Sequence, residues 1–570
     1  MKIFLAQINP IIGDLKGNAE KILKISSKAF ENSADLVLTP ELSLWGYPPK
    51  DLLFKKNLIK AQNLILDELS NSISKKFGDL SIAIGIAEKI NDPFFPDLYN
   101  SIALLEKGNW KIICRKIILP SYEVYDEKRY FRSENKVAIL QKKINNKIWK
   151  IGLTICEDLW VNHDIEGRGI HKKNPIFDLE GKNIDCLLNL SASPYTLKKL
   201  ENRIKISSNA AKNLGIPLIY INQVGGNDDL IFDGNSFIIN KYGEKIKQLK
   251  SFKEDSYCWK ISEKNLLSPS KENDTDLEVI FNALVLGVKD YAKKCGFKTA
   301  LIGLSGGIDS ALVTVIASAA LGNKNIFCIA MPSKWSSESS KIDANKLARN
   351  LNINFNTIPI NNIFDTFEND FKTAINLKIE GIANENIQSR IRGTLLMALA
   401  NQKNHLLLST GNKSELAVGY CTLYGDMNGG LSVIGDLYKT NVFKICNWLD
   451  SELSMKVREN HNLPFNKKII GDKILQKPPS AELGPNQFDT DSLPPYEELD
   501  IILKGIIEEK KDLSELLKIG YKKDLILKIF KLIKKAEFKR KQAPPILKLS
   551  SQSLGNDWRI PIAISNKQIQ

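Results

Sequence analysis

Three residues in the first half of the chain each follow an apolar run that predicts a β-strand. Glu41 ends LVLTPEL, Lys116 lies in CRKIILP and Cys156 lies in GLTICEDLW. A thiol nucleophile needs a base and a group that stabilises the oxyanion. Glu41 can take the thiol proton, and Lys116 can stabilise both the thiolate and the tetrahedral intermediate. This set of residue types therefore predicts nucleophilic cleavage of an amide by Cys156.

Each of the three residues also has a simpler interpretation when it is taken alone. Cysteines on strands are usually small buried hydrophobes, and single glutamates and lysines are usually surface charges. The three strings together resemble the nitrilase or carbon–nitrogen hydrolase superfamily over about residues 1–260. That resemblance implies an α-β-β-α sandwich with Glu41, Lys116 and Cys156 as its catalytic trio. Glu127 is a candidate second carboxylate that supports the trio.

The string GLSGGIDSAL in the second half lies between an apolar strand pattern and a helical pattern. Adjacent glycines let the backbone approach a ligand, the two serines add hydroxyl donors, and the following helix directs free N–H groups at the loop. This pattern predicts a phosphate site, although the lysine of the GxxxxGK[ST] loop is missing. Asp309 would repel a bare phosphate, so we expect Mg²⁺ to bridge it to the phosphates. The expected ATP-binding residues are Gly303, Leu304, Ser305, Gly306, Gly307, Ile308, Asp309 and Ser310.

The complete loop resembles that of the N-type ATP pyrophosphatases, which cleave ATP to AMP and pyrophosphate. Later strings narrow the resemblance to the NAD synthetases, and it then covers nearly all of residues 277–565. These strings are ENIQSRIRG, STGNKSELAVGYCTLYGDMNGGLSVIGDLYKTNVF, KPPSAEL, DSLPPYEELD and EFKRKQAPP. The first of them is expected to precede a helix. The resemblance implies a doubly wound parallel sheet of the adenine nucleotide alpha hydrolase type.

The same resemblance implies a role for several residues outside the loop. It makes Thr410 an ATP contact and Glu415 a contact to the metal or the dinucleotide. It makes Asn386 and Lys539 contacts to deamido-NAD, the acid form of the product. One position departs from the family pattern, because Ile546 stands where members usually carry glycine.

The string LPSYEVYDEKRYF resembles the glutaminase form that is joined to NAD synthetases. By that similarity Tyr122 lines a glutamine pocket, and Ser193 and Lys199 of NLSASPYTLKK bind glutamine. A different register of this string would instead place Ser191 or Lys198 in these roles. The two halves together resemble the glutamine-dependent NAD synthetases, which implies that deamido-NAD is amidated with ammonia from L-glutamine through an adenylated intermediate.

Alternating strand and helix patterns must position these residues. In the first half we expect helices over residues 18–31 and 57–74, a hairpin at KYGEK, and strands over residues 2–9, 34–41, 80–89, 100–106, 151–158, 184–191 and 218–223. A polar stretch without apolar periodicity predicts a linker. Beyond the linker we expect helices over residues 277–294, from the glycine loop to residue 321, and over residues 339–351. The strands expected there span residues 299–304, 326–331 and 354–358. We therefore expect a first domain over residues 1–262, a linker over residues 263–276 and a second domain over residues 277–570.

Composition limits the remaining possibilities. The 570 residues include 43% hydrophobic and 25% charged residues, which is typical of a cytoplasmic globular protein without a membrane span. The net charge of +15 is spread along the chain, so we interpret it mainly as solubilising charge rather than a nucleic-acid surface. The family also implies a homodimer or larger assembly. The alternatives are another amidotransferase with the same loop, an RNA-binding protein and an inactive scaffold.

Overall fold

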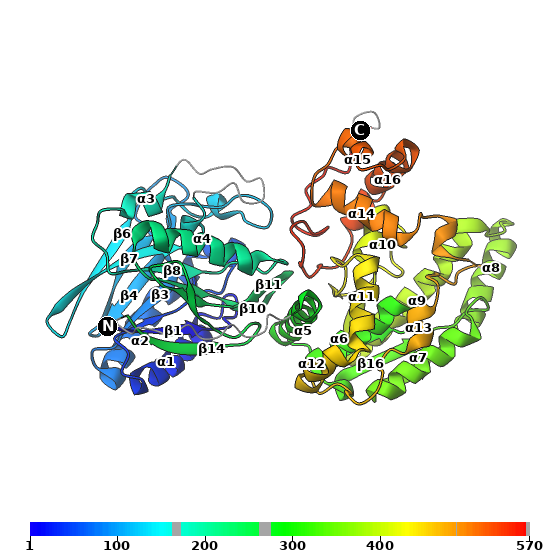
Figure 1. The fold of residues 1–570 in the computed structure, drawn as a ribbon. Helices are drawn as coiled ribbons and strands as arrows, with labels where there is room; N and C mark the ends of the chain where they lie inside the picture. Colours follow the sequence, from blue (N-terminus) through cyan, green and yellow to red (C-terminus); the bar gives the residue numbers. More distant parts are fainter. Residues whose placement is uncertain (162–172, 262–274, 486, 566–570) are drawn as a thin grey trace. The chain divides into compact units, whose positions relative to one another are not determined.

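Two separate units make up the chain in the computed structural model, Met1–Asn273 and Asp274–Gln570 (Figure 1). The structure describes residues 1–161, 173–261, 275–485 and 487–565. Most of the expected linker 263–276 therefore lies outside the described residues. Its last two residues begin helix α5 (Asp276–Lys294), whose first turn is capped by the Thr275 side chain.

Two six-stranded sheets form the first unit. One sheet has the order β14-β1-β2-β3-β4-β5 and the other β13-β12-β9-β8-β7-β6. The strands of the first sheet are β1 (Lys2–Gln7), β2 (Leu36–Leu38), β3 (Ser81–Lys89), β4 (Leu98–Glu106), β5 (Asn109–Arg115) and β14 (Asp255–Lys260). Those of the second are β6 (Ala138–Ile144), β7 (Lys147–Ile155), β8 (Cys186–Ser191), β9 (Leu218–Asn222), β12 (Phe237–Ile239) and β13 (Lys245–Gln248).

The apolar alternation of the strands places one core between the two sheets. Leu38, Ile102, Ile155 and Leu190 are among its buried side chains, so strands of both sheets contribute to it. Helices α1 (Leu15–Glu31) and α2 (Lys56–Phe77) cover one outer face, and α3 (Pro175–Leu179) and α4 (Lys199–Leu214) cover the other (Figure 1). This is the expected α-β-β-α sandwich. A small hairpin of β10 (Val224–Asn227) and β11 (Leu230–Asp233) adjoins it.

A five-stranded parallel sheet forms the centre of the second unit, in the order β17-β16-β15-β18-β19. Because the order reverses beside β15, the connections that follow β15 and β18 leave the sheet on opposite faces and open a crevice between them. The strands are β15 (Ala300–Gly303), β16 (Ile326–Ala330), β17 (Asn354–Thr357), β18 (Leu406–Ser409) and β19 (Leu431–Ser432).

Helices cover both faces of this sheet, as the resemblance implies. Helix α6 (Ile308–Leu321) packs against β15, β16 and α5. Leu301 points to the opposite face and shares a core with α8 (Asn361–Ile375) and α9 (Gly381–Lys403). Other described helices of this unit are α7 (Glu338–Leu351), α10 (Lys413–Val418), α11 (Lys439–Leu449), α14 (Tyr496–Ile507), α16 (Lys523–Lys535) and α17 (Glu537–Arg540).

Some predicted boundaries were wrong. The strand expected over 151–158 stops at Ile155, because Cys156 has a φ of 46° and leaves the extended conformation. The string ENIQSRIRG lies inside α9 rather than before a helix. Strands β5, β6 and β14 were missed; their alternating polar residues made them look like loops. Among the described helices none has the length and apolar composition of a membrane span.

Candidate active sites in the two units

Lys116 is the centre of the site in the first unit. Its Nζ lies 2.6 Å from Glu41 Oε1 and 2.8 Å from Glu127 Oε1, and its side chain is fully buried. Glu41 follows β2, Lys116 follows β5 and Cys156 follows β7, so strand ends of both sheets bring these residues together. Glu41 also accepts hydrogen bonds from the Asn100 side chain at 2.7 Å and from a backbone amide at 3.0 Å. These bonds hold its carboxylate in place.

Cys156 directly follows β7 and is the first residue of the 3-10 turn Cys156–Leu159. Its φ of 46° is uncommon for a residue with a side chain, and such strained positions cluster at functional sites. Burial and the Glu41 carboxylate raise the pKa of the Cys156 thiol well above its ordinary value, whereas Lys116 opposes the rise. The thiol is therefore protonated at rest, and a base must accept its proton when it attacks.

Glu127 lies with the trio and, like Glu41, is ion-paired with Lys116. The Tyr47 hydroxyl donates to its Oε1 at 2.8 Å. Burial raises the pKa of Glu127 to about 7, with Glu41 adding to the rise and Lys116 opposing it. Burial also favours the neutral form of Lys116, but Glu127 and Glu41 outweigh it and raise the lysine pKa. Lys116 is thus held as a cation between two carboxylates.

The residues expected to bind glutamine lie close to this trio. The Tyr122 hydroxyl donates to Glu157, the neighbour of Cys156, at 2.7 Å. Ser193 is buried, and Lys199 is buried with its ammonium 4.6 Å from the centre of the Trp160 ring.

The alternative positions have different surroundings. Lys198 is exposed and precedes α4 with a φ of 67°, so its side chain is directed to solvent. The Ser191 hydroxyl donates to Asn189 Oδ1 at 2.5 Å. The Ser193 hydroxyl also has a protein partner, because it accepts from Arg203 Nε at 3.2 Å. Lys199 is thus buried where Lys198 is exposed, whereas both serine hydroxyls are buried and hydrogen-bonded.

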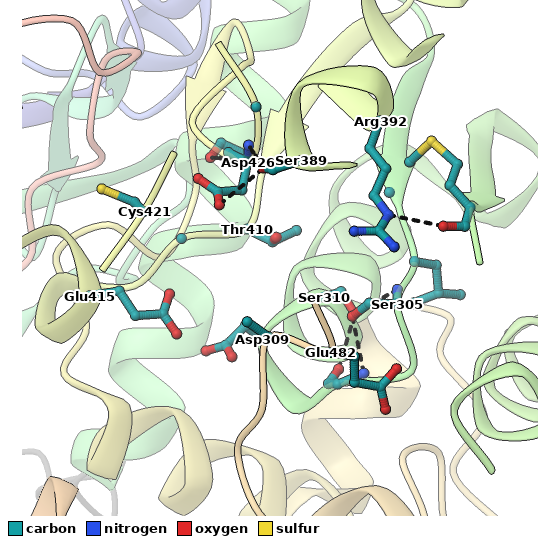
Figure 2. Close-up of a pocket in the computed structure, with 18 of the residues that line it drawn as sticks. Ser305, Asp309, Ser310, Ser389, Arg392, Thr410, Glu415, Cys421, Asp426 and Glu482 are labelled. Atoms are coloured by element: carbon teal, nitrogen blue, oxygen red, sulfur yellow. Dashed lines mark hydrogen bonds between the residues drawn. The ribbon is translucent and has the colours of Figure 1, made fainter. Parts of the chain in front are cut away.

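The loop between β15 and α6 lines a cavity of about 320 Å³ in the second unit. Ser305 and Ser310 are linked through their hydroxyls at 3.1 Å (Figure 2). Gly306 has a φ of 84°, and a Cβ there would lie 2.3 Å from the Ser340 carbonyl oxygen, so the turn requires glycine. The expected loop residues line the cavity apart from Gly306, whose absent side chain instead lets the loop approach α7.

Asp309 and Glu415 point toward one another across this cavity (Figure 2). Lys439 lies between them, with its Nζ 2.5 Å from Asp309 and 3.2 Å from Glu415. Burial raises the pKa of Glu415 to about 8, with Asp309 adding to the rise and Lys439 opposing it. No local pattern distinguishes Lys439 from other lysines, since only the fold places this buried lysine beside the loop. Thr410 lines the same cavity.

The two carboxylates suit a magnesium ion bound together with substrate phosphates. Mg²⁺ in nucleotide enzymes is commonly held by one or two carboxylates, phosphates and water rather than by a cage of protein ligands. Among the described residues no group of three or more histidine, cysteine or acidic side chains has the arrangement of a metal site. Asp309 and Glu415 therefore fit the metal only as a pair that shares it with ATP.

Asn386 and Lys539 lie at one side of the cavity but do not line it. The Thr422 hydroxyl donates to Asn386 Oδ1 at 2.8 Å. Lys539 Nζ donates to the carbonyl oxygens of Gly419 and Cys421 at 2.8 and 2.7 Å. Both expected dinucleotide contacts thus meet at the segment 419–422, whose residues Tyr420 and Cys421 do line the cavity.

Ile546 does not disturb the fold at the position where the family pattern has glycine. Its side chain is buried in the core of the helical part of this unit. It pairs with Ser432 beside the end of β19, and its backbone is not in the left-handed region. A side chain is therefore accommodated here without strain.

Both units are similar to known protein families. Residues 2–262 match the carbon-nitrogen hydrolase family and residues 280–543 match NAD synthase. The glutamine-dependent NAD(+) synthetases of Synechocystis sp. and Acinetobacter baylyi are 46% and 38% identical to this chain, and each comparison covers 98% of both proteins. The solved glutamine-dependent NAD+ synthetase from Acinetobacter baumannii, in complex with adenosine diphosphate, is 35% identical, with a TM-score of 0.74 over 98% of each chain.

Proposed function

Because the chain belongs to the glutamine-dependent NAD(+) synthetase family, we propose that its two sites carry out the two halves of one reaction. The overall reaction is the synthesis of NAD from deamido-NAD, ATP and glutamine. We assign glutamine hydrolysis to residues 1–262 and amide formation to residues 277–570, with 263–276 as the linker. The separate clusters around Lys116 and Lys439 support this division.

In the first unit Cys156 attacks the side-chain amide carbon of glutamine while Glu41 accepts the thiol proton. Lys116 stabilises the negative charge on the amide oxygen in the tetrahedral intermediate. Glu41 then gives its proton to the leaving nitrogen, and ammonia departs from a glutamyl thioester. Water attacks the thioester with Glu41 again as base, which releases glutamate and restores the thiol. Tyr122, Ser193 and Lys199 orient the glutamine.

In the second unit the nicotinate carboxylate of deamido-NAD attacks the α-phosphate of ATP, and pyrophosphate leaves. The loop 303–310 and the N-terminus of α6 hold the leaving phosphates through backbone amides and hydroxyls. Lys439 supplies positive charge where the phosphates crowd, and Thr410 contacts ATP. Ammonia from the first unit displaces AMP and forms the amide. Asn386, Glu415 and Lys539 are assigned to deamido-NAD.

We also assign Asp309 and Glu415 to a bound Mg²⁺. The ion neutralises phosphate charge when it is bound with ATP. Lys439, which contacts both carboxylates, would lie beside the ion and the phosphates. The carboxylate pair that faces across the cavity supports this assignment (Figure 2).

The buried Lys116 between Glu41 and Glu127, beside the strained Cys156, is the observation that carries the proposal for the first unit. The test is NAD formation from deamido-NAD, ATP and Mg²⁺, with glutamine or ammonium as nitrogen source. Cys156→Ala should abolish synthesis from glutamine and keep synthesis from ammonium. Asp309→Ala should abolish both and keep glutamine hydrolysis. Loss of ammonium-supported synthesis in Cys156→Ala would contradict the division of labour.

We further propose that two copies of the chain associate through the layer formed by α8 and α9. Four apolar residues lie at intervals of four along α8, Ile363, Phe367, Phe371 and Ile375, and 36–62% of their surfaces is exposed. Exposed apolar surfaces of this kind mark association sites, and a two-fold interface brings the same patch of each copy together. A second copy of the chain, related by a two-fold axis, is the simplest partner for these four apolar residues of α8.

A further inference from the structure

We infer that Asp158 is a positioning residue that sets the separation between Lys116 and Cys156. This inference rests on the glutaminase role proposed above. Asp158 belongs to the 3-10 turn that begins at the nucleophile, and its carboxylate is buried with 1% exposure. It stabilises no substrate atom and acts through the backbone on either side of it.

Three backbone amides donate to this carboxylate. Oδ1 accepts from Ile117 at 3.1 Å and from Ile118 at 2.8 Å, and Oδ2 accepts from Ile155 at 3.0 Å. Ile117 directly follows Lys116, and Ile155 directly precedes Cys156. One carboxylate therefore holds the backbone next to the oxyanion-stabilising lysine and the backbone next to the nucleophile.

Strand pairing does not make this connection. Lys116 follows β5 at the edge of one sheet, whereas Cys156 follows β7 of the other sheet. The two sheets meet through side-chain packing, which is less directional than hydrogen bonding. The Asp158 carboxylate joins the two strand ends through directional, charge-assisted hydrogen bonds. A shift of either end would move the lysine relative to the sulfur.

Substitutions of Asp158 give a graded test. Asp158→Ala removes all three acceptor bonds, and a misplacement of about 1 Å lowers a catalytic rate about 100-fold. Asp158→Asn keeps one acceptor oxygen but turns an NH₂ group toward a backbone N–H, so we expect a fall of about tenfold. In both variants kcat for glutamine hydrolysis should fall while KM changes by less than about threefold, because the glutamine-binding residues are untouched.

Asp185→Asn is the matched control. Asp185 also accepts a β7 amide, from Lys150 at 2.8 Å, but it lies away from the Cys156 end of that strand. We expect wild-type kcat in this variant. Ammonium-supported synthesis should remain in every variant because it depends on the second unit, and circular dichroism of each variant reports whether the first unit is folded.

Alkylation of Cys156 by iodoacetamide at different pH values separates positioning from a merely structural role. The charges that face the thiol are Glu41, Lys116, Glu157 and Glu127, of which only Lys116 favours the thiolate. If Asp158 holds Lys116 beside the sulfur, the alkylation midpoint should move to higher pH in Asp158→Asn. A residue that only supports folding would leave the folded fraction with the wild-type midpoint.

The possible results lead to different conclusions. Wild-type kcat and an unshifted midpoint in Asp158→Asn would overturn the positioning role, even if Asp158→Ala is too unstable to purify. If Cys156→Ala still makes NAD from glutamine, the proposed glutaminase site itself is wrong. The glutaminase site is supported if Cys156→Ala does not make NAD from glutamine. The positioning role of Asp158 is then supported if Asp158→Asn has a reduced kcat and a shifted alkylation midpoint.

Discussion

At the scale of single residues, both sites hold a buried lysine between two carboxylates. Lys116 lies between Glu41 and Glu127, and Lys439 lies between Asp309 and Glu415. Buried ion pairs of this kind are weak stabilisers, because removing the charges from water offsets most of their attraction. Their value is that the lysine cation is already in place where negative charge arrives with the substrate or develops in the reaction.

Glu415→Gln should stabilise the ligand-free protein at high pH while it abolishes ammonium-supported synthesis. The pKa of Glu415 is raised to about 8, so the wild type loses stability as the pH rises from the unfolded pKa of about 4.3 through 8. The neutral glutamine avoids this loss. The increase in Tm should therefore be larger at pH 9 than at pH 5, as measured by differential scanning fluorimetry.

Glu338→Gln provides the control for this prediction, because its side chain is 76% exposed. Its Tm should follow that of the wild type at both pH values. A Glu415→Gln variant whose Tm advantage is the same at pH 5 and pH 9 would show that Glu415 does not carry a raised pKa.

At the scale of elements, helix α6 has a positive-φ glycine on either side of it, and the two glycines do different things. Gly306 has a φ of 84° and lies against the Ser340 carbonyl oxygen; Gly322, at the other end, has a φ of 85° and only a distant neighbour at 4.0 Å. An added side chain is therefore strained at both sites, but only Gly306 shapes the phosphate loop.

Gly306→Ala and Gly322→Ala should separate these effects. Each places alanine in a backbone conformation that side chains rarely adopt, which costs on the order of 1–3 kcal/mol. Only Gly306→Ala forces the loop away from α7, so we expect ammonium-supported synthesis to fall at least about 100-fold in that variant. Gly322→Ala should keep more than about half of its kcat. Glutamine hydrolysis should be unchanged in both, and equal losses of synthesis would refute the specific role of the loop turn.

At the scale of the whole molecule, two units with separate cores each complete one site from their own residues. On the proposed division of the reaction, ammonia must pass from the first unit to the second. Near neutral pH free ammonia is mostly protonated and is then a poor nucleophile. A route that shields ammonia from protonation would therefore favour glutamine-supported synthesis.

The double substitution Phe367→Glu and Phe371→Glu should dissociate the assembly proposed through α8. The charges would be buried without partners in the interface, whereas each lies in water in a single chain. Sedimentation velocity should give the mass of one 64.0 kDa chain for this variant and a multiple of it for the wild type. Leu64→Glu, on an exposed side chain of α2, should keep the wild-type mass. A wild-type chain that sediments as a monomer would refute the interface.

Local patterns in the sequence determined the elements and the identity of the chemistry. Apolar periodicity placed many of the strands and helices, because burial of a strand or helix face imposes it residue by residue. It did not place the short buried strand β18 or the helix α9 of the second unit. The glycine loop was predictable because its turn and its helix are adjacent in the chain. Edge strands such as β5 and β6 were not predictable from the sequence, because exposure of one face weakens their apolar signal.

The tertiary structure decided what is brought together from distant positions. Glu127 next to Lys116, Lys439 between Asp309 and Glu415, and Asp158 bonded to Ile117 all depend on how separate elements pack. A buried charge or a strained turn has no local sequence pattern, because its environment comes from residues tens to hundreds of positions away. The sequence by itself therefore determined which reactions this protein has the groups to perform. Only the fold decided how those groups are charged, spaced and held.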